Sequence, residues 1–143
     1  MLSSNKSKDG LVVEGKAFWC FLNEPNIQFE PQWSLRLVGS ELEQRIFNHG
    51  GFDMRMEQLN GKDVGLSVLM RRKVRSMDDV LKKPILLDKN QNRLELFEEL
   101  PNGSNVKVKY KCWERTHPFE DKVVKGIDLI AVLLLDEVPK LFV

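Results

Sequence analysis

Apolar and polar residues alternate with a period of two along several short stretches of this chain, which predicts strands with one buried face. The main strands are expected over residues 11–22, 33–38, 65–74, 106–115 and 126–138. Residues 52–57 predict a further short strand, and residues 84–88 with 93–97 predict a hairpin around a polar turn. The pattern therefore indicates a chain made mostly of strands.

Turn and cap residues separate these strands. Residues 23–26, which include Pro25, predict a turn, and Asn60-Gly61 predicts a hairpin turn. Ser40 followed by Glu43 is a capping-box pattern, so a short helix is expected over 40–48, ended by the glycines at 50 and 51. Residues 76–81 predict one helical turn, and residues 1–10 a flexible leader.

About seven short strands, little helix and no internal repeat predict a mainly β fold. We expect an OB-like five-stranded barrel with an extra hairpin and one or two short helices, as a single domain over residues 11–143. An immunoglobulin-type sandwich is the alternative, although the helix and the missing paired-cysteine pattern are atypical of it. The last strand is apolar on both faces, so it is expected to be covered on both sides or to form a subunit interface.

Composition adds less than the distribution of charge. The 143 residues are 42% hydrophobic and 30% charged, with a formal net charge of +1, which is typical of a folded soluble protein. Basic residues concentrate in two stretches: five against one acid over 62–75, and four against one over 104–115. A binding face can therefore be locally basic on a nearly neutral protein.

The termini and cysteines predict a cytoplasmic protein. The start of the chain has no signal-peptide pattern, and the longest apolar run is far shorter than the roughly 20 residues that span a bilayer. Cys20 and Cys112 each lie in a predicted strand and are expected to be buried thiols in a reducing compartment.

The predicted strand 106–115 has two contrasting faces. Val106, Val108, Tyr110 and Cys112 form the apolar face, and the opposite face carries Lys107, Lys109, Lys111, Trp113 and Arg115. A row of cations that ends in an indole is typical of a surface that binds phosphates and stacks bases. Lysines on the solvent face of an antiparallel strand also serve solubility, so this alternative stays open.

Two other predicted strands, 11–22 and 33–38, combine cations with aromatic residues, and the strand 65–74 contributes cations. The candidate nucleic-acid-binding residues are Lys16, Trp19, Trp33, Arg36, Arg71, Arg72, Lys73, Lys107, Lys109, Lys111, Trp113 and Arg115. Whether Phe18 or Trp19 faces a ligand is left open by the pattern. Most other aromatic residues are expected in the core, namely Phe21, Phe47, Phe52, Phe97 and Tyr110.

Other chemistry is not indicated. Cys20, His49, Cys112 and His117 show none of the close spacings of zinc sites, so no metal or other cofactor is expected. The sequence has no phosphate-binding glycine loop and no nucleophile elbow, and we do not expect an enzyme.

Three segments carry a family resemblance: GKAFWCFLNEP followed by FEPQWSLRL, the hairpin ILLDKNQNRLELF, and NGSNVKVKYKCW with GIDLIAVLLLDEV. Together they resemble the OB-fold single-stranded DNA-binding proteins of short-tailed DNA phages and related viruses, over residues 15–141. The resemblance implies a homodimer that coats single-stranded DNA during replication and recombination, and works with the polymerase and helicase-primase in the host-cell cytoplasm. It also implies that DNA binds at Lys107, Lys109, Lys111, Trp113 and Arg115.

The family's long acidic tail with a terminal aromatic residue has no counterpart in this sequence. The chain reads VPKLFV over 138–143, with only Asp136 and Glu137 nearby, so the tail's roles in partner binding and dimerisation are not carried over.

The leading hypothesis is therefore a non-sequence-specific single-stranded DNA-binding protein. The alternative is a β-domain for protein–protein interaction or structural assembly, and the choice between DNA and RNA is open because stacking and phosphate contacts serve both.

Overall fold

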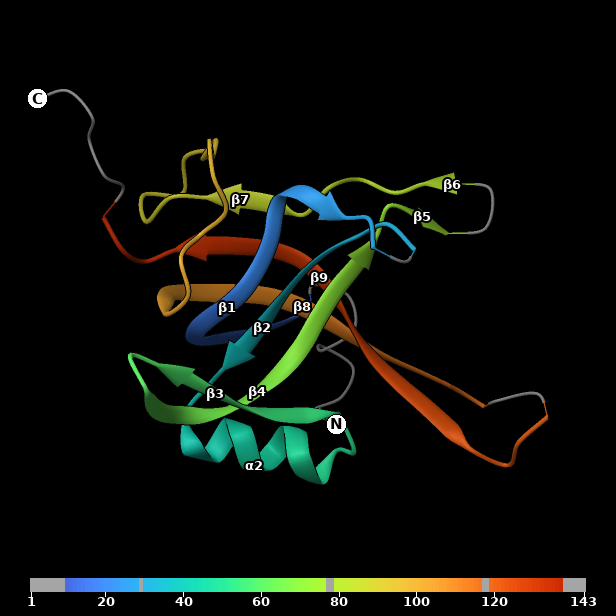
Figure 1. The fold of residues 1–143 in the computed structure, drawn as a ribbon. Helices are drawn as coiled ribbons and strands as arrows, with labels where there is room; N and C mark the ends of the chain where they lie inside the picture. Colours follow the sequence, from blue (N-terminus) through green and yellow to red (C-terminus); the bar gives the residue numbers. More distant parts are fainter. Residues whose placement is uncertain (1–9, 29, 77–78, 117–118, 138–143) are drawn as a thin grey trace, which may run out of the picture.

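The computed structural model describes residues 10–28, 30–76, 79–116 and 119–137 (Figure 1). Apart from residue 10, the predicted leader lies outside these ranges. In chain order the elements are β1 (Leu11–Asn26), β2 (Gln32–Val38), α2 (Glu41–His49), β3 (Met54–Leu59), β4 (Lys62–Lys73), β5 (Arg75–Ser76), β6 (Asp79–Val80), β7 (Ile85–Leu87), β8 (Ser104–Thr116) and β9 (Val123–Leu134). The mainly β class is confirmed.

The five longest strands form a closed barrel. The sheet order is β3-β4-β2-β1-β8-β9-β7, and an additional parallel pairing of β4 with β9, between Arg71 and Asp128, closes the ring of β4, β2, β1, β8 and β9. β3 and β7 extend this barrel sheet beyond the ring, while β5 and β6 pair separately. The OB-like five-stranded barrel with extra strands is confirmed.

Alternation along the strands places the core inside the barrel. Inward-facing residues that are almost completely buried include Leu35, Leu37, Val68, Met70, Val106, Val108, Leu129 and Val132. Phe47 and Tyr110 are buried as predicted, with ring centroids 5.9 Å apart, and Phe52 packs against this cluster. The core prediction is wrong for Phe97, which is 93% exposed, and for Phe21, which is also exposed.

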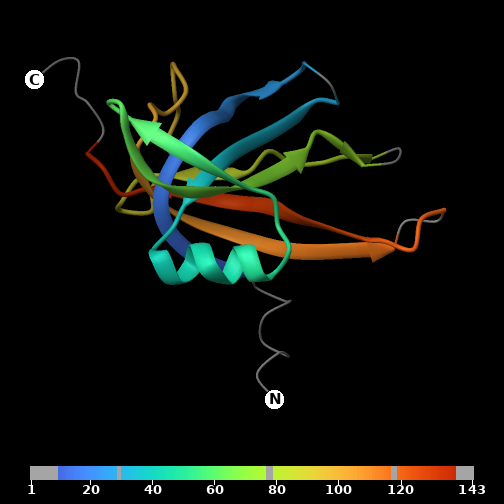
Figure 2. The same ribbon diagram turned by 60° about the horizontal axis from the view of Figure 1, so that its bottom comes forward.

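The predicted helix is confirmed together with its cap. The Ser40 hydroxyl accepts a hydrogen bond from the Glu43 amide at 3.2 Å, and the Glu43 carboxylate accepts one from the Ser40 amide at 3.0 Å. Gly51, just after the helix, has a φ of +83°, which a residue without a side chain adopts easily. The helix lies across one end of the barrel, next to β3 and β4 (Figure 1 and Figure 2).

The turn predicted at 23–26 is wrong, because β1 runs through to Asn26. The Glu99 carboxylate accepts hydrogen bonds from the backbone amides of Leu22, Asn23 and Glu24, at 2.6 to 3.1 Å. A side chain from a distant part of the sequence thus satisfies backbone donors at the end of the strand.

Two predictions in the segment between β4 and β8 also need correction. The one-turn helix expected at 76–81 is a pair of two-residue strands, β5 and β6. The hairpin expected at 84–97 is reduced to a single bridge between Leu87 and Arg93, while β7 pairs in parallel with β9. No helix among the described residues is long and apolar enough to cross a membrane.

The β8–β9 hairpin projects beyond the barrel (Figure 1). Its inner face has less to pack against there, which explains why Cys112 is exposed although alternation predicts a buried thiol. Cys20 is buried as expected, and burial raises the pKa of its thiol to about 12. β9 itself is covered: Ile127 and Leu129 lie in the core, while Leu133 on its other face is half-buried.

Candidate nucleic-acid interface

The outer face of β8 carries the cations that alternation assigns to it. Val106, Val108 and Tyr110 point into the core, and the residues between them point outward. The β8–β9 register places Lys109 opposite Ala131 and Lys111 opposite Asp128. Leu133, Gly126 and Val124 lie opposite the other outward positions of β8 from Lys107 to Arg115, so Asp128 is the one charged residue that β9 places opposite this row.

Trp113 is fixed in place on the same face by the glycine opposite it. A Cβ built on Gly126 would lie 2.1 Å from Cζ2 of the indole, so the ring occupies space that only glycine leaves open. The guanidinium carbon of Arg115 lies 5.8 Å from the centroid of the Trp113 ring, within cation–π range. Trp113 is half-buried, which leaves part of its surface accessible to a base.

Lys16 joins this face from the neighbouring strand. In the β1–β8 register Lys16 stands opposite Asn105, and its Nζ donates to Asn105 Oδ1 at 3.1 Å. Glu14, opposite Lys107, places its Oε1 3.7 Å from Lys107 Nζ, in an exposed ion pair that stabilises little. The β8 cationic face consists of Lys16, Lys107, Lys109, Lys111, Trp113 and Arg115.

The basic end of β4 lies one strand away from β8. In the strand register, Asp128 on β9 lies opposite Arg71 of β4 on one side and opposite Lys111 of β8 on the other. Lys73 lies 3.6 Å from Glu30, and Arg71 Nη1 donates to Gln32 Oε1 at 3.5 Å. The two basic stretches of the sequence thus approach each other across a single strand, with one carboxylate between them.

Arg72 opens onto a groove that sequence reasoning did not find. The groove, of about 830 Å³, lies between β4 and β7 and is called the β4–β7 groove. Its charged lining includes Arg72, Lys82, Lys83, Arg93, Lys111 and Asp128. The sequence does carry a signal for this groove, the pair Lys82-Lys83 before Pro84. These lysines fall between the predicted one-turn helix and the predicted hairpin, so neither prediction included them.

Trp19 and Arg36 belong to a different group around a buried carboxylate, the Glu57 cluster, which consists of Trp19, Arg36, Arg55, Glu57 and Ser67. Glu57 is only 4% exposed and accepts from Trp19 Nε1 at 2.8 Å and from Ser67 Oγ at 2.6 Å. Arg36 is 8% exposed; its Nε donates to Ser67 Oγ at 2.8 Å and lies 3.5 Å from Glu57 Oε2.

The Glu57 carboxylate is held ionised by its neighbours. Burial alone would raise its pKa, but hydrogen bonds from Ser67, Trp19 and Arg55 outweigh burial and hold the pKa below the ordinary value. Burial lowers the pKa of Arg36, as does nearby Arg55. The charge of Arg36 is thus balanced inside the protein and is not presented to solvent.

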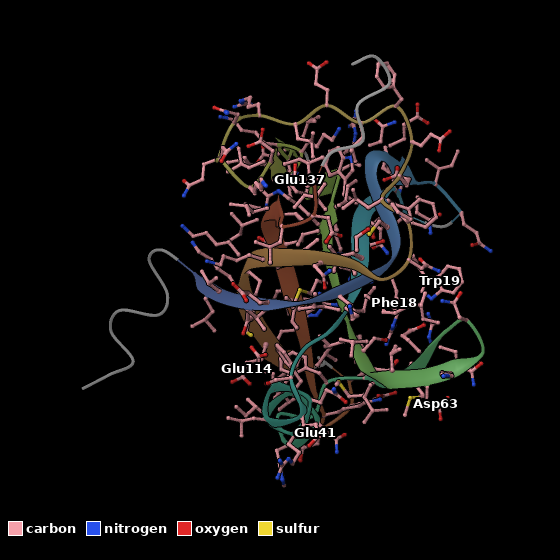
Figure 3. All side chains as sticks on the ribbon, turned by 90° about the vertical axis from the view of Figure 1, so that its left-hand side faces the viewer. Phe18, Trp19, Glu41, Asp63, Glu114 and Glu137 are labelled. Atoms are coloured by element: carbon pink, nitrogen blue, oxygen red, sulfur yellow. The ribbon has the colours of Figure 1, made fainter. Side chains whose placement is uncertain are left out.

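The aromatic candidates of β1 and β2 separate in the same way. Phe18 is completely buried, whereas Trp19 is 53% exposed and lies toward the β3–β4 turn, marked by Asp63 in Figure 3. Trp33 is 9% exposed, and its indole nitrogen has no hydrogen-bond partner in the part of the chain that the structure describes. Trp33 and Arg36 are therefore buried and do not belong to the β8 cationic face, and Trp19 lies apart from that face beside Glu57.

The described residues contain no group of three or more histidine, cysteine, aspartate or glutamate side chains arranged to hold a metal ion.

Comparisons with known proteins place the fold. No protein-family profile and no curated protein sequence matches this chain significantly. The solved structure of gp2.5, a single-stranded DNA-binding protein encoded by bacteriophage T7, matches with a TM-score of 0.62 and 12% identity, over 91% of this chain and 87% of that one.

A second phage protein gives a similar result. The single-stranded DNA-binding protein from bacteriophage Enc34 matches with a TM-score of 0.58 and 14% identity, over 94% of this chain and 89% of that one. Its complex with single-stranded DNA matches with a TM-score of 0.57 and 14% identity, over 96% of both chains. The chain therefore has the fold of these phage single-stranded DNA-binding proteins.

Proposed function

We propose that this protein binds single-stranded DNA without sequence specificity, using the β8 cationic face together with Arg71 and Lys73 at the end of β4. The observation that carries the proposal is the row of Lys107, Lys109 and Lys111 leading to Trp113, on a barrel shared with single-stranded DNA-binding proteins over nearly the whole chain.

The chemistry of these side chains suits a binder that does not read bases. Lysine ammonium groups attract phosphate oxygens at any sequence, and an indole stacks on any base, with roughly 1 to 3 kcal/mol per stacked base. Trp113, fixed on Gly126, is already oriented and loses little freedom when a base packs on it. The protein acts as a binding protein and not as an enzyme.

The same proposal includes the biological setting that the family resemblance implies. The protein coats single-stranded DNA in phage replication and recombination in the host cytoplasm, as a homodimer that contacts replication proteins such as the polymerase and the helicase-primase. Light scattering of the purified protein, with and without DNA, tests the homodimer.

The primary test is a titration with fluorescent oligo-dT of about 30 nucleotides at low and high salt, following tryptophan fluorescence and oligonucleotide anisotropy together. Three lysine–phosphate contacts predict that log K falls with log salt at a slope of about −2. We expect salt-sensitive binding with tryptophan quenching. Absence of binding at low salt would contradict the proposal, and an equal affinity for oligo-U would extend it to RNA.

A protein-interaction domain is the second candidate, and one observation favours it. Phe97, 93% exposed, lines an apolar groove of about 580 Å³ together with Leu94, Leu96 and Leu134. Exposed apolar surface of this kind is typical of partner-binding sites. Binding at such a groove would be nearly insensitive to salt, which separates it from DNA binding in the same titration.

A further inference from the structure

The β4–β7 groove forms where β9 changes its edge partner. Asp128 of β9 pairs with Arg71 of β4, and from Ala131 onward β9 pairs with β7. Two residues, Leu129 and Ile130, lie between these pairings, so the pairings are three residue steps or about 10 Å of strand apart. Over this length no strand among the described residues pairs with this edge of β9, and the groove of about 830 Å³ opens there.

The groove is strongly cationic. Five cationic side chains line it against two carboxylates, Glu95 and Asp128. Lys82 and Arg93 are exposed, and Lys83 donates to the backbone carbonyl of Asn23 at 3.0 Å, which ties this wall to the end of β1. Excess positive charge in a concave surface concentrates anions.

Arg72 is held in a fixed position on the groove wall. Its Nη1 donates to both oxygens of Asp128, at 3.1 and 2.9 Å, and its Nε donates to the Lys82 carbonyl at 2.6 Å. Among the described residues its Nη2 has no hydrogen-bond acceptor. A guanidinium anchored through two of its nitrogens is pre-organised for a phosphate oxygen at the third.

Aliphatic side chains, Ile85, Leu94 and Ile130, also line the groove. They offer a base or sugar an apolar surface beside the cations that would bind the phosphates. Lys111 belongs both to this groove and to the β8 cationic face, so the two surfaces are continuous.

We propose that the β4–β7 groove is a second phosphodiester-binding site, which holds the stretch of single-stranded DNA that continues past Lys111, through contacts from Arg72, Lys82 and Arg93. This inference rests on the proposed function, and extends the DNA path from the β8 cationic face around the edge of β9. Longer strands then bind more tightly than short ones because they occupy both surfaces.

The test compares two oligonucleotide lengths on a variant of the groove. The double variant Lys82→Gln with Arg93→Gln is titrated with oligo-dT of about 6 and about 20 nucleotides. The loss of two phosphate contacts predicts that the variant's salt slope for the longer strand is smaller than that of the wild type by about 1.4. We expect roughly tenfold weaker binding of the longer strand and unchanged binding of the shorter one.

A matched control keeps the change in charge the same. Arg45→Gln with Lys62→Gln also removes two exposed cations, from α2 and from the start of β4. Equal affinities and salt slopes for the two double variants would overturn the groove proposal while leaving the β8 face intact. Equal weakening for both lengths would also overturn it. In that case the two cations would attract any anion near the protein, and would not bind the part of a longer strand that continues past Lys111. A wild-type protein that binds neither strand would overturn the proposed function, and this inference with it.

Discussion

The β8 cationic face and the Glu57 cluster are built from similar side chains but use them in opposite ways. Each contains a tryptophan and an arginine, Trp113 with Arg115 on one and Trp19 with Arg36 in the other. In the Glu57 cluster a buried carboxylate binds the indole N–H and lies beside the arginine. Beside the β8 row lie two partly exposed carboxylates: Glu14 is 3.7 Å from Lys107, and Asp128, opposite Lys111, binds Arg72.

Residue type alone therefore does not distinguish a binding surface from a structural cluster around a buried carboxylate. What separates the two regions is whether the neighbouring carboxylate is buried. β3 brings Glu57, only 4% exposed, against Arg36 and Ser67 of β2 and β4, whereas Glu14 and Asp128 beside the β8 row are 61% and 34% exposed.

Removing the Glu57 charge should break the cluster. Glu57→Gln leaves Arg36 buried without its counter-charge, so we expect the free energy of unfolding to fall by about 3 kcal/mol in urea titrations. DNA affinity per folded molecule should not change. The control is Glu30→Gln, which removes the exposed partner of Lys73 and should cost less than about 1 kcal/mol. Equal losses in the two variants would refute the contrast.

Removing the side chains of the β8 face should have the reverse outcome. Lys109→Ala with Lys111→Ala and Trp113→Ala removes one stacking ring and two phosphate contacts, so we expect a loss of DNA affinity of about 2 kcal/mol, or about 30-fold, without unfolding. Anisotropy titration measures the affinity, and circular dichroism checks the fold.

The matched variant removes one tryptophan and one cation from the Glu57 cluster, and one exposed cation from the start of β4: Trp19→Ala with Arg55→Ala and Lys62→Ala. It should lose stability, because Trp19 and Arg55 both contact Glu57, but keep its affinity. A folded triple variant of β8 with an unchanged dissociation constant would exclude the β8 face as the binding site.

Acid should weaken the Glu57 cluster selectively. Because the folded-state pKa of Glu57 is lowered from 4.5, its ionised form contributes stability that is fully present above pH 4.5 and is lost as the pH falls through the folded-state pKa. We expect the stability difference between wild type and Glu57→Gln to shrink in urea titrations below pH 4.5. Asp136, whose pKa is also lowered, titrates in both proteins and cancels in the difference. A constant difference down to pH 3 would contradict this account.

The smallest effect is expected at the glycine beneath Trp113. Gly126→Ala places a methyl group where the indole lies, so the ring has to move off the strand to make room for it. We expect a red-shifted tryptophan emission, a loss of stability below about 1 kcal/mol and a few-fold change in DNA affinity. The control Gly61→Ala adds a methyl group where nothing lies within 4 Å of it; its φ of +79° strains an alanine, so this variant should lose stability but keep an unshifted emission. An unshifted emission spectrum would show that the indole does not rest on Gly126.

Local patterns predicted the parts of the fold that depend on neighbours in sequence. The capping box at Ser40 and Glu43, the turn at Asn60-Gly61 and the two faces of β8 were all predicted by periodicity and turn chemistry. The β8 row was identified because each of its cations has the same parity as Trp113, and that relation does not depend on the rest of the chain.

The remaining features depend on contacts that are distant in sequence. Glu99 extends β1 through the predicted turn from more than seventy residues away, and Glu57 covers Arg36 although parity places that arginine outward. The β4–β7 groove requires β7 to pair in parallel with β9, a choice that neither segment's own pattern specifies. No local signal distinguishes a cation with a partner across the barrel from one without.

The single parallel pairing of Arg71 with Asp128 that closes the barrel also makes this junction its seam. One pairing is the least that joins two strands, so amide hydrogens beside it should exchange with solvent sooner than those deep in the long β8–β9 ladder. A DNA strand bound by both Arg72 of β4 and Lys111 of β8 would cross this junction and hold β4 and β9 together. Binding DNA would then also stabilise the closed barrel.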